Sequence, residues 1–114
     1  MTQTDAGRRA AEIARLNDQF RSNWSGGQIV ITLGIQTLSP EQIREVVEAV
    51  WQFSDFTPDN DPHGEHDCAV ITAGGERIIW KIDYYDRALK YGSPDPADPA
   101  VTTRVLTIML ASEY

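Results

Sequence analysis

The chain has 114 residues, which is the size of one domain with one hydrophobic core. Apolar residues make up 41% and charged residues 24% of the sequence, and this globular composition excludes a mainly disordered chain. Seventeen Asp and Glu residues against ten Lys and Arg residues give a net charge of −7, so no direct nucleic-acid binding is expected.

The first predicted helix covers residues 5–20, with Thr4 or Asp5 as its cap. Its apolar residues recur at helical spacing: Ile13, Leu16 and Phe20. Four arginines of this segment could form a local basic patch despite the acidic total: Arg8, Arg9, Arg15 and Arg21. After a turn, residues 28–33 are rich in β-branched side chains and predict a short buried strand.

The second predicted helix has the clearest start in the chain. Ser39 is suited to the N-cap, Pro40 occupies the first helical position, and Gln42 completes a capping box. One face of this helix is apolar: Ile43, Val46, Val47, Val50 and Trp51. We expect the helix to end near Ser54.

A polar loop over residues 56–66 follows, because two prolines and a glycine exclude regular structure there. Residues 67–73 and 76–85 then predict a β-hairpin around Gly74-Gly75. The core face of its second strand is expected to carry alternate residues: Ile78, Trp80, Ile82 and Tyr84.

Residues 86–97 form a second irregular connection, after which Asp98 and Pro99 predict the start of a last helix. Its apolar stripe would be Val101, Val105, Ile108 and Met109. The predicted order is α-β-α-β-β-α in a single domain over residues 1–114. The fold class is therefore α+β, with a small three-stranded, mainly antiparallel sheet and helices packed on one face.

Targeting features are absent from the sequence. The first nine residues contain no apolar run of the kind a secretory signal needs, and the longest apolar runs are too short to cross a bilayer. Cys68 is the only cysteine, so no intramolecular disulfide is possible and nothing indicates an oxidising compartment. We expect a cytoplasmic protein without a membrane partner.

The polar loop and the residue after it contain six side chains that commonly bind metal ions: Asp59, Asp61, His63, Glu65, His66 and Asp67. A calcium-binding EF-hand loop starting at Asp59 fails, because its twelfth position is Val70 rather than Glu. A zinc site formed by His63, His66 and Cys68 has no second ligand pair elsewhere. The simpler interpretation, which we favour, is a loop held by its own side chains.

The hairpin suggests a second site. A two-residue turn would place His66 opposite Asp83 and Cys68 opposite Lys81, on the face away from Trp80. A His66–Asp83 pair there could act as a general base. A cross-strand ion pair is the simpler interpretation, and a one-residue shift in register would move His66 and Cys68 into the core.

Tyrosines with interleaved charges follow at residues 81–86, a pattern that suits protein recognition because aromatic residues anchor interfaces. Core packing of Tyr84 and simple exposure of Tyr85 would explain the same residues without a partner.

Four segments resemble an uncharacterised bacterial family, domain of unknown function 3768: residues 56–67, 80–86, 91–99 and 103–111. Cys68 stands where an aromatic residue is expected, which argues against a catalytic thiol. The resemblance implies no established activity. It implies a bacterial cytoplasmic protein, often carried on plasmids or other mobile elements, and such a setting favours anti-defence, regulation or plasmid upkeep.

Our leading hypothesis is a non-enzymatic, acidic protein-interaction module without a cofactor, whose partner is a protein. The residues expected to contact the partner are Asp59, Asp61, Glu65, Asp83, Tyr85 and Asp86. The alternative is a metal-dependent hydrolase or nuclease, in which the loop over residues 59–67 holds a divalent ion and His66 or Asp83 activates water. A third possibility is that the loops serve folding alone.

Overall fold

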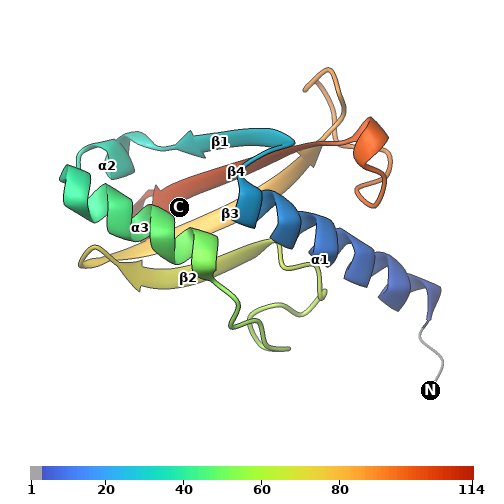
Figure 1. Ribbon diagram of the computed structural model, residues 1–114, viewed down its shortest axis with the longest axis horizontal. Coiled ribbons are helices and arrows are strands. Elements are labelled where there is room, and N and C mark those ends of the chain that lie inside the picture. Colours follow the sequence, from blue (N-terminus) through green and yellow to red (C-terminus); the bar gives the residue numbers. More distant parts are fainter. Residues whose placement is uncertain (1–3) are drawn as a thin grey trace.

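The computed structural model describes residues 4–114 and has an α+β fold (Figure 1). Residues 1–3 lie outside the described residues. They belong to the N-terminal segment in which we expected no secretory signal. The elements in chain order are α1 (Asp5–Asn23), β1 (Gly27–Ile31), α2 (Leu33–Gln36), α3 (Pro40–Gln52), β2 (Cys68–Ala73), β3 (Glu76–Tyr85), a 3-10 turn η1 (Pro99–Val101), β4 (Thr103–Leu110) and a second turn η2 (Ala111–Glu113). In the described part of the chain, no helix combines the length and apolar character needed to span a membrane.

The sheet is four-stranded and mixed, with the order β1-β4-β3-β2. β1 runs parallel to β4, and the other two neighbouring pairs are antiparallel. The predicted hairpin is confirmed. Gly74 and Gly75 have φ angles of +61° and +77°, the positive values that a tight type I′ turn requires. Cys68 pairs with Lys81, so of the two registers left open the hairpin has the one expected for a two-residue turn.

The predicted last helix is wrong, because residues 103–110 form strand β4. The segment is rich in β-branched residues, and two neighbouring strands provide hydrogen-bond partners on both of its sides. Alternate residues of β4 point into the core: Arg104, Leu106 and Ile108. The start signal at Asp98 and Pro99 produces only the single turn η1, in which the Asp98 carboxylate accepts the Ala100 N–H at 2.9 Å. The sheet therefore has a fourth strand and a parallel pair that we did not predict.

Strand β1 also differs from the prediction, because it is an exposed edge strand rather than a buried one. Ile29 and Val30 remain 38% and 43% exposed. The strand ends at Ile31, and the short helix α2 follows without having been predicted. β-branched residues favour an extended backbone on an edge as well as inside a sheet, so composition alone did not reveal this position.

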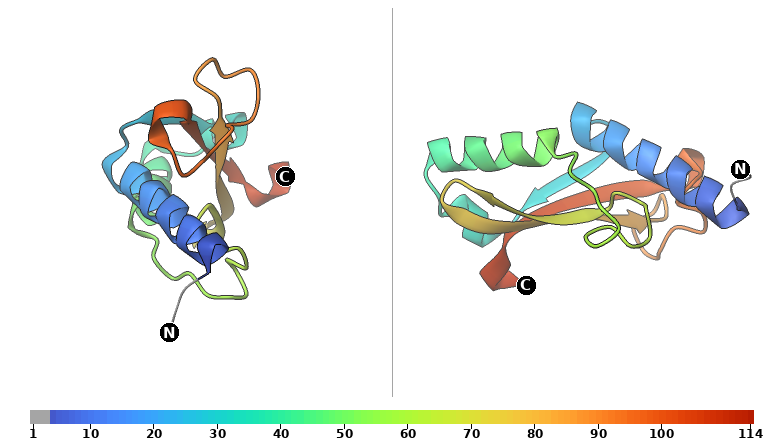
Figure 2. Two further views of the ribbon diagram at one scale, coloured as in Figure 1. Left: turned by 90° about the vertical axis from the view of Figure 1, so that its right-hand side faces the viewer. Right: turned by 90° about the horizontal axis from the view of Figure 1, so that it is seen from below.

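Helices α1 and α3 cover one face of the sheet, as expected (Figure 2). The predicted capping box of α3 is present: the Gln42 N–H donates to Ser39 Oγ at 3.1 Å, and the Ser39 N–H donates to Gln42 Oε1 at 2.9 Å. Thr4 caps α1 by accepting the Gly7 N–H. The core between helices and sheet contains Phe20, Ile35, Val46, Val50, Ile78, Trp80, Ile82, Leu106 and Ile108. The predicted inward face of β3 is thereby confirmed.

Candidate functional site

The loop that joins α3 to β2 is irregular but fixed by its own hydrogen bonds. The Thr57 N–H donates to Asn60 Oδ1 at 2.8 Å, and the Asn60 N–H donates back to Thr57 Oγ1 at 3.3 Å. The Asn60 amide also donates to the Asp55 carbonyl, and the Asp61 N–H donates to the Thr57 carbonyl. The interpretation of a loop held by its own side chains is therefore confirmed for residues 55–61.

His66 lies at the end of this loop between two carboxylates. Its Nδ1 is 2.9 Å from Asp18 Oδ2 on α1, and its Nε2 is 3.6 Å from Asp61 Oδ2. The imidazole stacks on Phe56 with 4.0 Å between ring centroids. The backbone φ of His66 is +55°, a left-handed conformation that is uncommon outside glycine and is associated with functional sites. The ring is thus held in one orientation by contacts on several sides.

Arg21 connects α1 with α3 and shares the Asp18 carboxylate with His66. Its Nη1 donates to the Val50 carbonyl at 2.8 Å, and its Nη2 is 3.2 Å from the Asp18 carboxylate. The guanidinium also lies over Trp80, 4.9 Å from the ring centroid. Burial lowers the pKa of Arg21, and the Asp18 carboxylate opposes that shift. Arg21 therefore caps the last carbonyls of α3 and carries a charge that Asp18 balances.

A second buried network joins α1 to the sheet. Asn17 is fully buried, and its Nδ2 donates to the Tyr84 hydroxyl oxygen at 2.8 Å and to the Glu65 carbonyl at 2.9 Å. The Tyr84 hydroxyl in turn donates to the Glu65 carboxylate at 2.9 Å. The Arg104 Nε donates to Asn17 Oδ1 at 2.7 Å. Burial raises the pKa of Tyr84 well above its usual range, so the phenol stays protonated and can donate to Glu65.

A groove of about 480 Å³ lies between the first half of α1 and the loop. Its helix wall consists of small residues, whereas its loop wall carries aromatic, proline and histidine side chains. The groove is lined by Gly7, Ala10, Ala11, Phe56, Thr57, Pro58, Asp61, Pro62, His63, Gly64 and His66. Of the residues predicted to bind a metal or a partner, Asp61, His63 and His66 line this groove, which we define as the α1–loop groove.

The predicted His66–Asp83 pair is not formed. The Asp83 carboxylate instead bonds Lys81 Nζ at 2.6 Å, while His66 bonds Asp18. Strand β2 begins only at Cys68, and the left-handed backbone of His66 turns its ring to the helix-covered side, against Phe56. Strand pairing therefore does not extend to His66.

Two of the other residues predicted for partner binding, Tyr85 and Asp86, lie where β3 ends. Tyr85 is partly buried, pairs with Thr103 of β4 and forms an isolated bridge with Gly92. The Asp86 carboxylate accepts the Lys90 N–H at 3.0 Å, which fixes the start of the next loop. Asp59 is exposed on the first loop.

The six predicted metal ligands do not converge. Within residues 4–114, no group of three or more His, Cys, Asp or Glu side chains is placed so that it could hold a metal ion. Asp61 is buried against His66, the Glu65 carboxylate accepts the Tyr84 hydroxyl, and Asp59 and His63 are exposed. Partial burial raises the pKa of Asp67, and the neighbouring carboxylates of Glu65 and Asp61 add to the rise.

Cys68 does not complete a zinc site with the two histidines. Its side chain is exposed on β2, and residues 4–114 contain no metal-binding group that includes it. Partial desolvation raises the pKa of its thiol, and the charges of Asp67 and Asp61 act in the same direction. A thiol with a raised pKa is a poor nucleophile at neutral pH.

The four arginines of the first segment do not form an unbalanced basic patch. Each one is ion-paired: Arg8 with Asp5, Arg9 with Asp95, Arg15 with Glu12, and Arg21 with Asp18. The Arg9–Asp95 pair, at 3.0 Å, also ties α1 to the second irregular loop. Each of these ion pairs balances one positive and one negative charge, so none of the four arginines contributes an unbalanced positive charge.

Sequence reasoning missed three polar residues that organise the site: the buried Asn17 and Arg104, and the partly exposed Asp18. For Arg104 a signal existed, because it alternates with Leu106 and Ile108 in a segment rich in β-branched residues. A strand interpretation would have placed a charged side chain on the inner face. For Asn17 and Asp18 no local signal separates them from ordinary helix surface residues.

Comparison with known proteins gives one match. A family model described as "Protein of unknown function (DUF3768)" matches residues 31–113. The matched region includes His66, Tyr84 and Arg104, whereas Asn17 and Asp18 precede it. No curated protein and no solved structure matches the chain.

Proposed function

We propose, for a chain that belongs to the DUF3768 family, a non-enzymatic role as an acidic protein-interaction module that binds its partner at the α1–loop groove. The observation that carries the proposal is the pairing of an open groove of about 480 Å³ with a loop already fixed by internal hydrogen bonds. A partner segment would enter beside Phe56 and His66, between the loop and the small residues of α1.

Preorganisation supports binding at this place. A loop that is already ordered loses little conformational entropy when a partner binds, so more of the contact energy appears as affinity. The Thr57–Asn60 pair of hydrogen bonds and the Phe56–His66 stack hold the loop wall in place. Gly7, Ala10 and Ala11 leave room on the opposite wall for a partner's side chains.

The charge around the groove supports a basic partner. Asp59 is exposed on the loop that forms one wall of the groove, and Asp61 is among the residues that line the groove. With a net charge of −7, the protein would attract a Lys- or Arg-rich protein segment and accelerate its association. On the family resemblance we assign the module to a cytoplasmic bacterial accessory protein carried on mobile elements, with a role in anti-defence or regulation.

The experiment has two stages. Immobilised wild-type protein captures partners from a host lysate, and mass spectrometry selects those that excess soluble wild-type protein displaces. Each selected partner is then purified and titrated against wild type, Ala11→Trp and Asp59→Asn. We expect Ala11→Trp to weaken binding at least about tenfold by filling the groove, and Asp59→Asn to weaken it about twofold to fivefold with a smaller salt dependence.

Matched controls test whether the groove itself matters. Ala6→Trp adds the same side chain on α1 outside the residues that line the groove, and Glu48→Gln neutralises an exposed carboxylate on α3. Both controls should bind as wild type does. A partner that binds wild type and Ala11→Trp equally, or the recovery of no displaceable partner, would reject the proposal.

A second candidate, a hydrolase, is favoured by the orientation of His66. Asp18 holds Nδ1 at 2.9 Å, and such a carboxylate–histidine contact can support general-base catalysis. In the metal-dependent form of this candidate, the loop over residues 59–67 would have to rearrange to gather ligands. That requirement makes it the weaker proposal.

Thermal unfolding with and without magnesium, manganese or zinc tests the hydrolase candidate, because a bound ion raises the melting temperature by mass action. Hydrolysis of bis(p-nitrophenyl) phosphate by wild type and by His66→Gln provides the catalytic readout. A metal-dependent stabilisation together with activity lost in His66→Gln would favour the hydrolase over the interaction module.

A further inference from the structure

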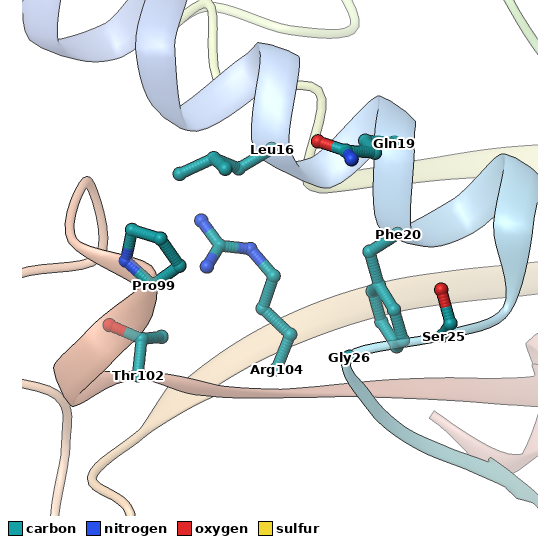
Figure 3. Close-up of a pocket in the computed structure, with 8 residues that line it drawn as sticks. All are labelled: Leu16, Gln19, Phe20, Ser25, Gly26, Pro99, Thr102 and Arg104. Atoms are coloured by element: carbon teal, nitrogen blue, oxygen red, sulfur yellow. The ribbon is translucent and has the colours of Figure 1, made fainter.

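A second, smaller cavity lies on the other side of α1. It has a volume of about 230 Å³ and is enclosed by the second half of α1, the turn before β1, and η1 with the start of β4. The residues that line it are Leu16, Gln19, Phe20, Ser25, Gly26, Pro99, Thr102 and Arg104. Figure 3 shows the Arg104 guanidinium in the middle of these residues, reaching toward Leu16 and Pro99. None of them lines the α1–loop groove.

Arg104 is buried there without a carboxylate partner. Arg104 is only 4% exposed. Among residues 4–114, no Asp or Glu oxygen lies within ion-pair distance of its guanidinium. Its hydrogen-bond acceptors are neutral: Asn17 Oδ1 and the Pro96 carbonyl, both at 2.7 Å. The Nη1 group has no hydrogen-bond partner in the described part of the chain.

The Glu65 carboxylate is linked to Arg104 through Tyr84, without a direct ion pair. The Glu65 carboxylate accepts the Tyr84 hydroxyl, and the guanidinium lies over the ring of that tyrosine, 5.2 Å from its centroid. Burial lowers the pKa of Arg104, and the charge of Glu65 opposes the shift without reversing it. A guanidinium remains protonated in a protein, so a positive charge is held at the wall of an open cavity. Such a charge is costly unless a counter-charge reaches it.

We propose that this cavity binds a small monocarboxylate with a compact apolar body. The carboxylate would accept hydrogen bonds from the two N–H groups of Arg104 Nη1, and hydrogen bonds between charged groups are stronger than those between neutral ones. Leu16, Phe20 and Pro99 supply apolar walls for the rest of the ligand, and Ser25 supplies a hydroxyl group. The Thr102 hydroxyl is already bonded to the Asp95 and Asp98 carbonyls. A phosphate dianion fits less well, because one arginine and the Ser25 hydroxyl would leave much of its charge unpaired.

The test uses the full chain and benzoate as the probe. Benzoate is titrated up to the millimolar range while the Arg104 Nε–H signal is followed by NMR, since that group donates to Asn17 and reports on the guanidinium. Benzamide has the same shape without the charge, and inorganic phosphate has charge without an apolar body. We expect a saturable shift with benzoate and at least tenfold weaker binding of both comparison ligands.

Two variants separate binding from folding. Arg104→Lys keeps the charge but loses the planar fork, and we expect at least a tenfold loss of benzoate affinity. Because Arg104→Lys could also disturb the core, Ser25→Trp is used to block the mouth without touching the buried network, and Ser112→Trp on η2 is its matched control. Ser25→Trp should abolish the shift, and Ser112→Trp should bind as wild type does.

Three results would overturn the proposal: no change in the Arg104 Nε–H signal at millimolar benzoate, equal affinity for benzoate and benzamide, or unchanged binding by Ser25→Trp. None of these results bears on the α1–loop groove. Failure of one proposal is therefore distinguishable from failure of the other.

Discussion

Arg21 and Arg104 are both 4% exposed and both contact aromatic rings, but their surroundings differ. Arg21, at the junction of α1 and α3, is paired with Asp18 and donates to the last carbonyls of a helix. Arg104, at the junction of α1 and β4, donates only to neutral oxygens and borders a cavity. The difference indicates that the first cation serves the fold, whereas the second is available to a ligand.

The largest expected effect is on the free energy of unfolding, when Arg21 or Arg104 is replaced by an uncharged residue. Arg21→Met should lower the free energy of unfolding by about 2–3 kcal/mol, because the Val50 and Trp51 carbonyls lose a charged donor and the partly exposed Asp18 carboxylate is left with its contact to His66. Arg104→Met should cost about 1–2 kcal/mol, since only neutral acceptors lose a partner. Urea unfolding measures both, with Arg15→Met on the exposed surface as the control.

The comparison would be broken if Arg104→Met proved the more destabilising variant. It would be sharpened by a ligand effect: benzoate should still raise the unfolding midpoint of Arg21→Met and should leave that of Arg104→Met unchanged.

A smaller effect should appear at alkaline pH through Tyr84, which lies beneath Arg104. Burial raises the pKa of Tyr84 above the ordinary value of 10.0. The folded state therefore resists losing this proton, and the stability linked to Tyr84 is constant below about pH 10 and is lost as the pH rises further. Urea unfolding at pH values on both sides of 10 should show a steeper loss for wild type than for Tyr84→Phe. Parallel curves would show that the phenol is not held protonated by the fold.

The smallest effect is expected at an exposed site outside both arginine regions. The Glu113 carboxylate accepts the Thr32 hydroxyl at 2.6 Å and the N–H groups of Leu110 and Gly34 at 2.8 and 3.0 Å. The Thr32 hydroxyl and these N–H groups lower the pKa of Glu113, so their stabilisation is present above its ordinary value of 4.5 and is lost as the pH falls.

Glu113→Gln should leave the global unfolding free energy nearly unchanged and speed hydrogen exchange at the Gly34 and Leu110 amides. Glu48→Gln on α3 is the control and should leave both exchange rates as they are. An unchanged rate in Glu113→Gln would show that these contacts are not maintained in solution.

Much of the fold was predictable from local patterns. The capping box at Ser39 and Gln42, the Gly74-Gly75 turn and the alternating core face of β3 are each specified within a few residues, and each is confirmed. The sequence of β4 satisfied both a helical and an alternating pattern over a short stretch. The choice between them depended on hydrogen bonds to β1 and β3, two strands that lie far from β4 in the sequence.

The candidate site was less predictable than the fold. The loop over residues 56–66 was predicted to be polar and held by its own side chains, and His66 was a candidate metal ligand and general base in the alternative interpretations. Its partner was predicted to be Asp83, because strand pairing was extended beyond Cys68, where β2 begins. Asp18, the actual partner, lies 48 residues earlier on a helix, and no local pattern indicates such a contact.

By itself, the sequence determined an acidic α+β domain of the DUF3768 family with a capped second helix and a tight hairpin. The capped helix and the hairpin turn depend on residues that are only a few positions apart in the sequence. Only the tertiary structure decided that β4 is a strand, that Asp18 holds His66, and that Arg104 meets Asn17, 87 residues away, without a carboxylate. These outcomes depend on which surfaces pack together, and burial then determines which polar groups must find partners.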